Sequence, residues 1–244
     1  MKSLLKKLFY WDRQMIIYAV LSLTVIISSY LLYLLLREDT VIRLGKEDGM
    51  FEYLTALSFF VTSLFFLLIF FRRKKLIHLV FALVFFIGMG EEISWGQRIF
   101  NYQSPEYFRE KNIQSEVNLH NLTIFDSQME GGNYKKGLSY YLSINFLYKL
   151  FWFIYGIMLP VGYILSPSLH KIIDKIDLLV PPFILGAIFL LNWIIRKMIL
   201  TFIVPIEDSP FYYYAGAEIG EFCSAIVFLM LSAYFFQTGN KAFK

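Results

Sequence analysis

The chain has 244 residues, of which 57% are hydrophobic and 19% aromatic, and its formal net charge at pH 7 is +4. A soluble domain is closer to about 45–50% apolar, so this composition excludes an ordinary soluble globular protein. The apolar residues form runs of about 20 residues, which matches the thickness of a bilayer. The sequence therefore predicts an all-α, polytopic integral membrane protein that forms a single membrane domain over residues 1–244.

Six transmembrane helices are predicted, and a polar loop over 37–49 separates the first two. Between the third and fourth spans lies a loop of about 40 residues, 98–138, in which Ser104-Pro105-Glu106 is a good helix start. We therefore expect short interfacial helices in this loop, and an amphipathic piece over 168–177 before the fifth span. The predicted spans are about 14–36, 50–71, 76–97, 139–165, 178–204 and 211–237.

The charges flanking these spans predict an orientation. An even number of spans puts both termini on one side, and that side carries 12 basic residues against only Asp12, Asp174 and Asp177. An excess of Lys and Arg marks the cytoplasmic side of a membrane. We expect a multi-pass protein of the cell membrane, with both termini in the cytoplasm and the 98–138 loop outside. The basic residues are Lys2, Lys6, Lys7, Arg13, Arg72, Arg73, Lys74, Lys75, Lys171, Lys175, Lys241 and Lys244.

Two adjacent acids, Glu91 and Glu92, end the third apolar run. Ionisable groups within a membrane are costly, and they are usually paired and functional. Glu91, Trp95 and Arg98 would line one helix face, whereas Glu92 would point about 100° away. The two acids are therefore expected to have different roles, one held ionised by an arginine and the other free to exchange a proton. Alternatively, both are interfacial acids that cap the end of the span beside Arg98.

Charges from distant parts of the chain are predicted to lie at the same membrane depth. A helix rises about 1.5 Å per residue, which places all of them in the outer half of a core about 30 Å thick. We expect them to gather around one outward-facing polar pocket, with an ion pair between Lys149 and either Glu221 or Glu218. A structural ion pair with Lys149 or Arg196 is the alternative role of these two acids. The charged residues are Glu52, Glu91, Glu92, Lys149, Arg196, Lys197, Glu218 and Glu221.

The outer loop contains His120, the only histidine predicted on that side. It is a candidate proton carrier or metal ligand, in the company of Glu116, Asn118 and Asn121. Carboxylates with one imidazole could hold a divalent metal, so such a metal is a candidate cofactor. Its ligands would come from Glu91, Glu92, His120, Glu218 and Glu221.

Three other residues are expected to have no role in chemistry. His78 and His170 are predicted to be interfacial residues near the cytoplasmic boundary. Cys223 is predicted to be a small buried apolar residue.

The Glu91-Glu92 pair at a helix end resembles the first motif of the CAAX-protease family of membrane glutamate proteases. In that family an arginine follows the second glutamate by four residues, whereas this position holds Gly96 and the arginine is Arg98. The family also has a histidine with a phenylalanine four residues before it, and none of the three histidines here meets that condition. The resemblance covers about ten residues, and we do not assign the chain to that family on it.

The sequence leaves three functions open. The first is a membrane-embedded enzyme, a hydrolase or transferase that acts on a lipid or lipid-linked substrate at the outer leaflet. The second is a non-catalytic membrane subunit whose outer pocket binds a lipid or a partner protein. The third is a transporter or channel, which the apolar inner halves of the spans disfavour. Membrane lipids are the expected partners, and no basic soluble domain indicates nucleic acid.

For the enzyme, Glu91 or Glu92 is the predicted general base and His120 a second proton carrier. The predicted catalytic set is Glu91, Glu92, His120, Glu218 and Glu221. The basic residues near the pocket would hold a phosphate or carboxylate head group. The predicted substrate-binding set is Trp95, Arg98, Asn121, Lys149, Arg196 and Lys197.

Overall fold

The computed structural model describes residues 8, 9, 11–46, 48–126, 135–205 and 209–239. The structure is 79% helical and has no strand in the described ranges. Of the basic residues that predict the orientation, Lys2, Lys6, Lys7, Lys241 and Lys244 lie outside these ranges.

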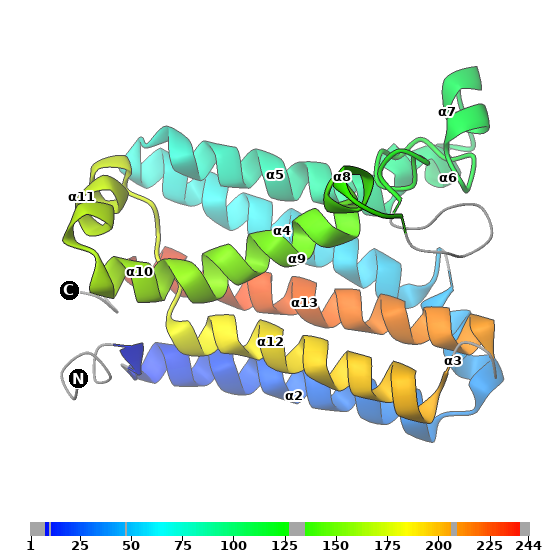
Figure 1. The fold of residues 1–244 in the computed structure, drawn as a ribbon, viewed down its shortest axis with the longest axis horizontal. Coiled ribbons are helices and arrows are strands. Elements are labelled where there is room, and N and C mark those ends of the chain that lie inside the picture. The colour runs from blue at the N-terminus through cyan, green and yellow to red at the C-terminus, as the bar shows by residue number, and fades with distance from the viewer. Residues whose placement is uncertain (1–7, 10, 47, 127–134, 206–208, 240–244) are drawn as a thin grey trace.

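Long helices run side by side as a bundle (Figure 1). Four of them are single elements: α2 (Arg13–Leu35), α4 (Met50–Arg73), α5 (Leu76–Glu92) and α13 (Pro210–Thr238). A fifth is the continuous run of α9 (Ile144–Phe153), a π-helical turn (Ile154–Met158) and α10 (Leu159–Leu165). The sixth is α12 (Phe183–Met198), which continues into a second π-helical turn (Ile199–Ile203). Shorter helices cover the two ends of the bundle: α3 (Glu38–Gly45), α6 (Gln97–Phe100), α7 (Glu106–Lys111), α8 (Leu138–Tyr141) and α11 (Pro167–Ile176).

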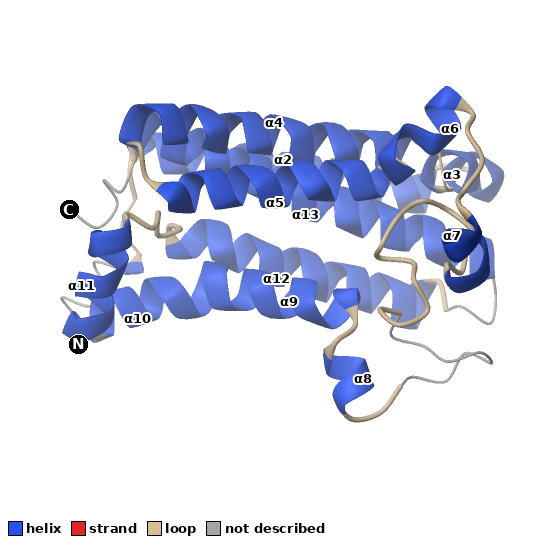
Figure 2. Cartoon of the chain, turned by 90° about the horizontal axis from the view of Figure 1, so that it is seen from above, coloured by secondary structure: helices blue, strands red, loops and turns tan. Residues whose placement is uncertain are grey.

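Five of the helices are long and apolar enough to cross a membrane, and a sixth span results if the bent pair Leu76–Glu92 and Ser94–Phe100 counts as one. The all-helical membrane class is therefore confirmed. The α2 start and the α13 end lie at the same end of the bundle, which we call the terminus end (Figure 1). The segment between α5 and α9 lies at the opposite end, which we call the loop end (Figure 2).

Several predicted boundaries are wrong, for local reasons. The predicted span 76–97 is helical only to Glu92, where the chain bends by 66°. The predicted span 139–165 starts at Ile144, because the Ser143 hydroxyl caps α9 by accepting a bond from the Phe146 amide. The predicted span 178–204 starts at Phe183, after two prolines that lack the N–H needed inside a helix. The predicted loop 37–49 contains the helix α3.

The helix α13 forms the centre of the bundle and packs against α2, α3, α4 and α12. Small side chains permit this close approach, as where Gly45 of α3 meets Ala215. Cys223 is fully buried in this interface, which confirms its predicted role. The buried Asn192 of α12 joins three helices, because it accepts from the Tyr30 hydroxyl at 2.9 Å and donates to the Gly220 carbonyl at 2.9 Å.

At the terminus end, Asp177 joins the α4–α5 hairpin to the α11–α12 connection. Its carboxylate accepts from Arg73 at 2.5 Å and lies 3.0 Å from His78 Nε2. His78 lies in the first turn of α5 at the terminus end, and its side chain is buried against the protein at 1% exposure; its predicted place at the membrane boundary stays a prediction. Burial raises the pKa of Asp177, but the hydrogen bonds from Arg73 and His78 outweigh it and hold the pKa below its ordinary value.

We predict that Asp177→Asn destabilises the protein. A hydrogen bond to a charged group contributes about 1.5–3 kcal/mol, which corresponds to a fall of about 3–10 °C in melting temperature for a chain of this size. Because the folded pKa of Asp177 is depressed, its contribution is complete above the unfolded pKa of about 3.9 and is lost as pH falls through the folded value. Melting curves in detergent should show the difference in melting temperature between wild type and variant becoming smaller from pH 6 to pH 3. The exposed control Asp39→Asn should not lower the melting temperature to the same extent. An equal fall in the control, or a difference for Asp177→Asn that does not change with pH, would contradict the stabilising role of the Asp177 carboxylate.

Candidate functional site

A cavity of about 680 Å³ opens at the loop end between α5, α9 and α13. All five predicted catalytic residues line it, together with Asn121, Lys149 and Arg196 from the predicted substrate-binding set. The structure thus brings these eight residues together around one space. Whether they carry out chemistry stays a prediction.

Three helices repeat one pattern in this cavity, a glutamate and a phenylalanine seven residues apart, with the phenylalanine two helical turns nearer the terminus end. The pairs are Glu52 and Phe59 on α4, Glu92 and Phe85 on α5, and Glu221 and Phe228 on α13. Seven residues along a helix span about 10 Å and return to the same face. The rings pack into one layer, with centroids 5.9 Å apart for Phe59 and Phe85 and 5.0 Å apart for Phe85 and Phe228. The cavity is therefore lined by carboxylates near the loop end, which we call its upper part. Nearer the terminus end it is closed by phenylalanine rings, which we call its floor.

The turn after α5 gives Glu91 and Glu92 different surroundings. Ser94 and Trp95 have positive φ angles of 45° and 53°, and the Trp95 ring folds back over Gly90, where a Cβ atom would come within 2.8 Å of it. In this position Trp95 Nε1 donates to Glu91 Oε1 at 2.8 Å. Backbone strain of this kind is maintained only when surrounding contacts fix it. The turn therefore fixes the orientation of the Glu91 carboxylate through Trp95.

Glu91 anchors the loop that covers the cavity. Its Oε2 atom accepts from the backbone amides of Leu119 at 2.5 Å and His120 at 3.0 Å, and it lies 3.5 Å from His120 Nδ1. Glu91 thus holds the loop segment that carries His120 and Asn121. Glu92 lines the same cavity.

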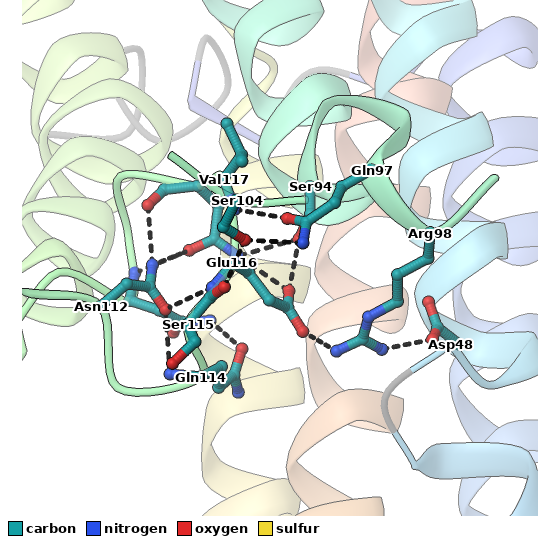
Figure 3. Close-up of polar contacts among 12 residues, drawn as sticks. Asp48, Ser94, Gln97, Arg98, Ser104, Asn112, Gln114, Ser115, Glu116 and Val117 are labelled. Atoms are coloured by element: carbon teal, nitrogen blue, oxygen red, sulfur yellow. Dashed lines mark hydrogen bonds and ion pairs between the residues drawn. The ribbon is translucent and has the colours of Figure 1, made fainter. Parts of the chain in front are cut away.

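A second network, centred on Glu116, fixes the same loop from the other side (Figure 3). The buried carboxylate of Glu116 accepts from the Ser94 hydroxyl and forms an ion pair with Arg98, which also pairs with Asp48. Asn118 Nδ2 donates to Glu116 at 3.1 Å. The ion pair with Arg98 and the hydrogen bonds from Ser94 and Asn118 offset the cost of burying this carboxylate, and they tie the loop to the turn after α5.

Two amide side chains complete that network (Figure 3). Asn112 Oδ1 accepts from the Gln114 amide at 2.9 Å and the Glu116 amide at 3.2 Å. Gln97 Oε1 accepts from the Val117 amide at 2.8 Å, while its Nε2 atom donates to Ser104 Oγ at 2.7 Å. These bonds satisfy backbone donors that a loop without regular structure would otherwise leave unpaired.

The predicted ion pair of Lys149 with Glu221 or Glu218 is wrong. Arg196 takes the place of the lysine, with its guanidinium 3.5 Å from Glu221 Oε1. Gly220 makes this possible, because a Cβ atom there would come within 2.4 Å of Arg196 Cδ. Lys149 lines the cavity and forms no ion pair among the residues that the structure describes.

Three predicted substrate-binding residues do not line the cavity. Trp95 is bonded to Glu91, and Arg98 is held by Asp48 and Glu116. The Lys197 ammonium lies 5.3 Å from the centre of the Trp193 ring on α12. The prediction that Glu91, Trp95 and Arg98 share one helix face is also wrong, because the helix ends before Trp95.

The predicted metal site is not formed by the side chains as they stand. Within the described ranges, no three His, Cys, Asp or Glu side chains are gathered closely enough to hold a metal ion. We therefore assign no metal to these carboxylates.

Comparisons of the chain with protein-family models, with curated proteins and with solved structures found no match. A function for this chain has to be argued from the site itself.

Sequence reasoning predicted Glu52 at the pocket but missed several other residues of the site. One of them is Phe59, seven residues from Glu52, although this spacing recurs on three helices. Ser94 and Gln97 were assigned to a helix and not to the loop network. Asn145 and Tyr148 of α9 line the cavity and carry no signal apart from helical periodicity with Lys149.

We predict that Glu116→Ala loosens the loop without unfolding the bundle. Removing one partner of a buried ion pair costs several kcal/mol, and each 1.4 kcal/mol raises the population of an open state about tenfold. Trypsin should therefore cleave after the exposed residues Arg109 and Lys111 at least about ten times faster. Asp39→Ala, which removes an exposed acid at the same end, should leave the rate unchanged. Equal cleavage rates for wild type and Glu116→Ala would show that the network does not order the loop.

Proposed function

We propose that this protein is a membrane-embedded enzyme, a hydrolase or transferase, that acts on a lipid or other amphiphile in the cavity between α5, α9 and α13. One observation carries the proposal: the cavity is amphipathic along its depth. Carboxylates and His120 surround its upper part, and phenylalanine rings form its floor. Its volume of about 680 Å³ lies in the usual range of small-molecule sites, about 300–1,000 Å³.

The side of the cavity supports entry from the lipid phase. Apolar residues of α5 and α9 line the cavity and are also solvent-exposed in the isolated chain, with Val84 49%, Ile87 46% and Ile144 38% exposed. The helices α5 and α9 form one face of the bundle with α13 behind them (Figure 2). An amphiphile could place its head among the carboxylates and leave its chain between α5 and α9.

Glu92 is the best candidate for a general acid or base. It lines the cavity together with Glu52, Glu218 and Glu221, whereas the oxygens of Glu91 are occupied by Trp95 and by the loop amides. His120, 3.5 Å from Glu91, is the candidate second proton carrier. A positioned acid or base contributes about 10²–10⁴-fold to a proton-transfer step.

The specific use of Glu91 as an anchor also supports the second candidate function, a non-catalytic subunit that binds a lipid or a partner protein. In that case Glu92→Asp would be tolerated, because ion pairing is less demanding of geometry than catalysis.

The orientation is part of this proposal: both termini in the cytoplasm and the loop outside. Because native Cys223 is fully buried, it should not react with a maleimide, so that labelling reports only on a cysteine introduced by substitution. In intact cells a membrane-impermeant maleimide should label Glu110→Cys and should not label Lys175→Cys until the cells are opened. The reverse pattern would invert the orientation.

Occupancy of the cavity can be tested with a matched pair of substitutions on α5. Val84 lines the cavity, while its neighbour Leu83 does not, and the two are 49% and 52% exposed. We predict that Val84→Trp, which fills the space, lowers the amount of lipid that copurifies with the protein, as measured by native mass spectrometry. Leu83→Trp should leave that amount unchanged. Equal lipid loading in both variants, at the wild-type level, would show that the cavity holds no amphiphile.

Catalysis is tested by comparing membranes from cells that express wild type, Glu92→Gln, Glu92→Asp or the exposed control Glu110→Gln at equal protein levels. If Glu92 transfers a proton, the wild type and the control change the ratio of one lipid species to its product. Glu92→Gln should reduce that change by at least about 100-fold. Identical lipid profiles for wild type and Glu92→Gln would reject the enzyme and favour the binding subunit.

A further inference from the structure

We infer that the terminus end of the bundle binds an anionic phospholipid through α11 and the turn between α4 and α5. This surface lies at the opposite end of the molecule from the cavity (Figure 1). The inference does not depend on the proposed function. It follows from the partners of the charged groups at the terminus end and from the way in which α11 presents its side chains.

The two acids of this region are occupied by partners within the protein. Asp174 of α11 accepts from the Tyr163 hydroxyl at 2.9 Å and lies 3.1 Å from His170 Nε2. Asp177, the residue directly after α11, forms the ion pair with Arg73 at 2.5 Å. Neither acid is paired with a lysine.

Four exposed lysines of the same region have no acid partner among the residues that the structure describes. Asp177 follows Lys175 by two residues, and Lys74 directly follows Arg73. The Asp177–Arg73 ion pair therefore brings the lysines of α11 and those of the α4–α5 turn to one part of the surface. Residues 72–75 and 167–177 together contain six basic residues and two acids, so this part of the surface is positively charged. The four lysines are Lys74, Lys75, Lys171 and Lys175.

The helix α11 has the form of a helix that lies at a membrane surface. Its Ile173 side chain is 2% exposed and faces the bundle. At about 100° per residue, Lys171 and Lys175 lie on the opposite side of the helix. Ile172 and Ile176 lie between these two sides, and they are 58% and 43% exposed in the isolated chain. The boundary of a bilayer would cover the two isoleucines, while the lysines would reach its head groups.

A phospholipid with a net negative charge matches both parts of this surface. Ammonium groups are donors only, and Lys171 and Lys175 are neighbours one helical turn apart, so that both can donate to one phosphate. The bundle has five or six helices that can span a membrane, which places its ends near the head groups in either orientation. A soluble anion would satisfy the lysines but would leave Ile172 and Ile176 uncovered.

The test uses the purified full chain in the neutral detergent dodecyl maltoside. The probes are dioctanoyl phosphatidylglycerol, which is anionic, and dioctanoyl phosphatidylcholine, which has no net charge. Binding is measured by the rise in melting temperature with probe concentration. We expect phosphatidylglycerol to bind more tightly, and we expect added salt to weaken its binding. The same preference should hold in Val84→Trp, where the cavity at the loop end is filled.

The lysines of α11 are tested by a double substitution, Lys171→Gln with Lys175→Gln. It should lower the affinity for phosphatidylglycerol by about tenfold to thirtyfold and leave that for phosphatidylcholine unchanged. The matched control, Arg109→Gln with Lys111→Gln, removes two exposed positive charges at the loop end and should bind as wild type. Lys171→Arg with Lys175→Arg keeps the charge and should also bind as wild type.

Four results would overturn the inference. Equal binding of the two lipids, or an unchanged affinity in Lys171→Gln with Lys175→Gln, would leave these lysines to another partner, such as an acidic protein. Weaker binding in the arginine pair would show that packing of α11, and not its charge, is responsible. A loss of the preference in Val84→Trp would move the lipid to the cavity. Glycerol phosphate that is as effective as phosphatidylglycerol would replace the lipid by a soluble anion.

Discussion

The cost of placing ions in hydrocarbon is the constraint on which this structure depends. A charged side chain in the middle of a bilayer costs at least about 2.5–3.5 kcal/mol, so charges inside a helical bundle must meet partners or water. This chain meets the requirement separately at its two ends. At the terminus end Asp177, Arg73 and His78 form one compact cluster that ties helix connections together. At the loop end the charges surround a cavity, which Glu116 and His120 of the loop also line.

The division of work between Glu91 and Glu92 follows from this arrangement. The strained turn at Ser94 and Trp95 directs the Glu91 carboxylate to the loop, where it binds the Leu119 and His120 amides. Of two neighbouring acids on one helix, Glu91 thus holds the loop, and Glu92 lines the cavity. The Glu116–Arg98 pair secures the same loop at a second point.

The sequence predicted the helices well, because hydrophobic run length determines them, and the rise per residue gave each charge an expected depth. An expected depth does not say which side chains meet. Lys149 and Arg196 both line the cavity, and the sequence could not tell which of them pairs with Glu221; in the structure it is Arg196, whose side chain lies where a Cβ on Gly220 would be. The bend after Glu92 was missed for a related reason. Nothing in the local sequence breaks the helix before Gly96, and the positive φ angles at Ser94 and Trp95 are fixed by contacts with the loop far along the chain.

Charges from six segments of the chain line one cavity, and we propose that this cavity holds an amphiphile. The most direct measurement is an experimental density map of the protein in a lipid nanodisc, recorded at a resolution that separates side chains. Our account predicts elongated density between α5, α9 and α13, with its compact end among Glu92, Glu218 and Glu221 and its thin end above the Phe85 and Phe228 rings. A map in which the helices close together and these glutamates reach water separately, with no space between them, would contradict it.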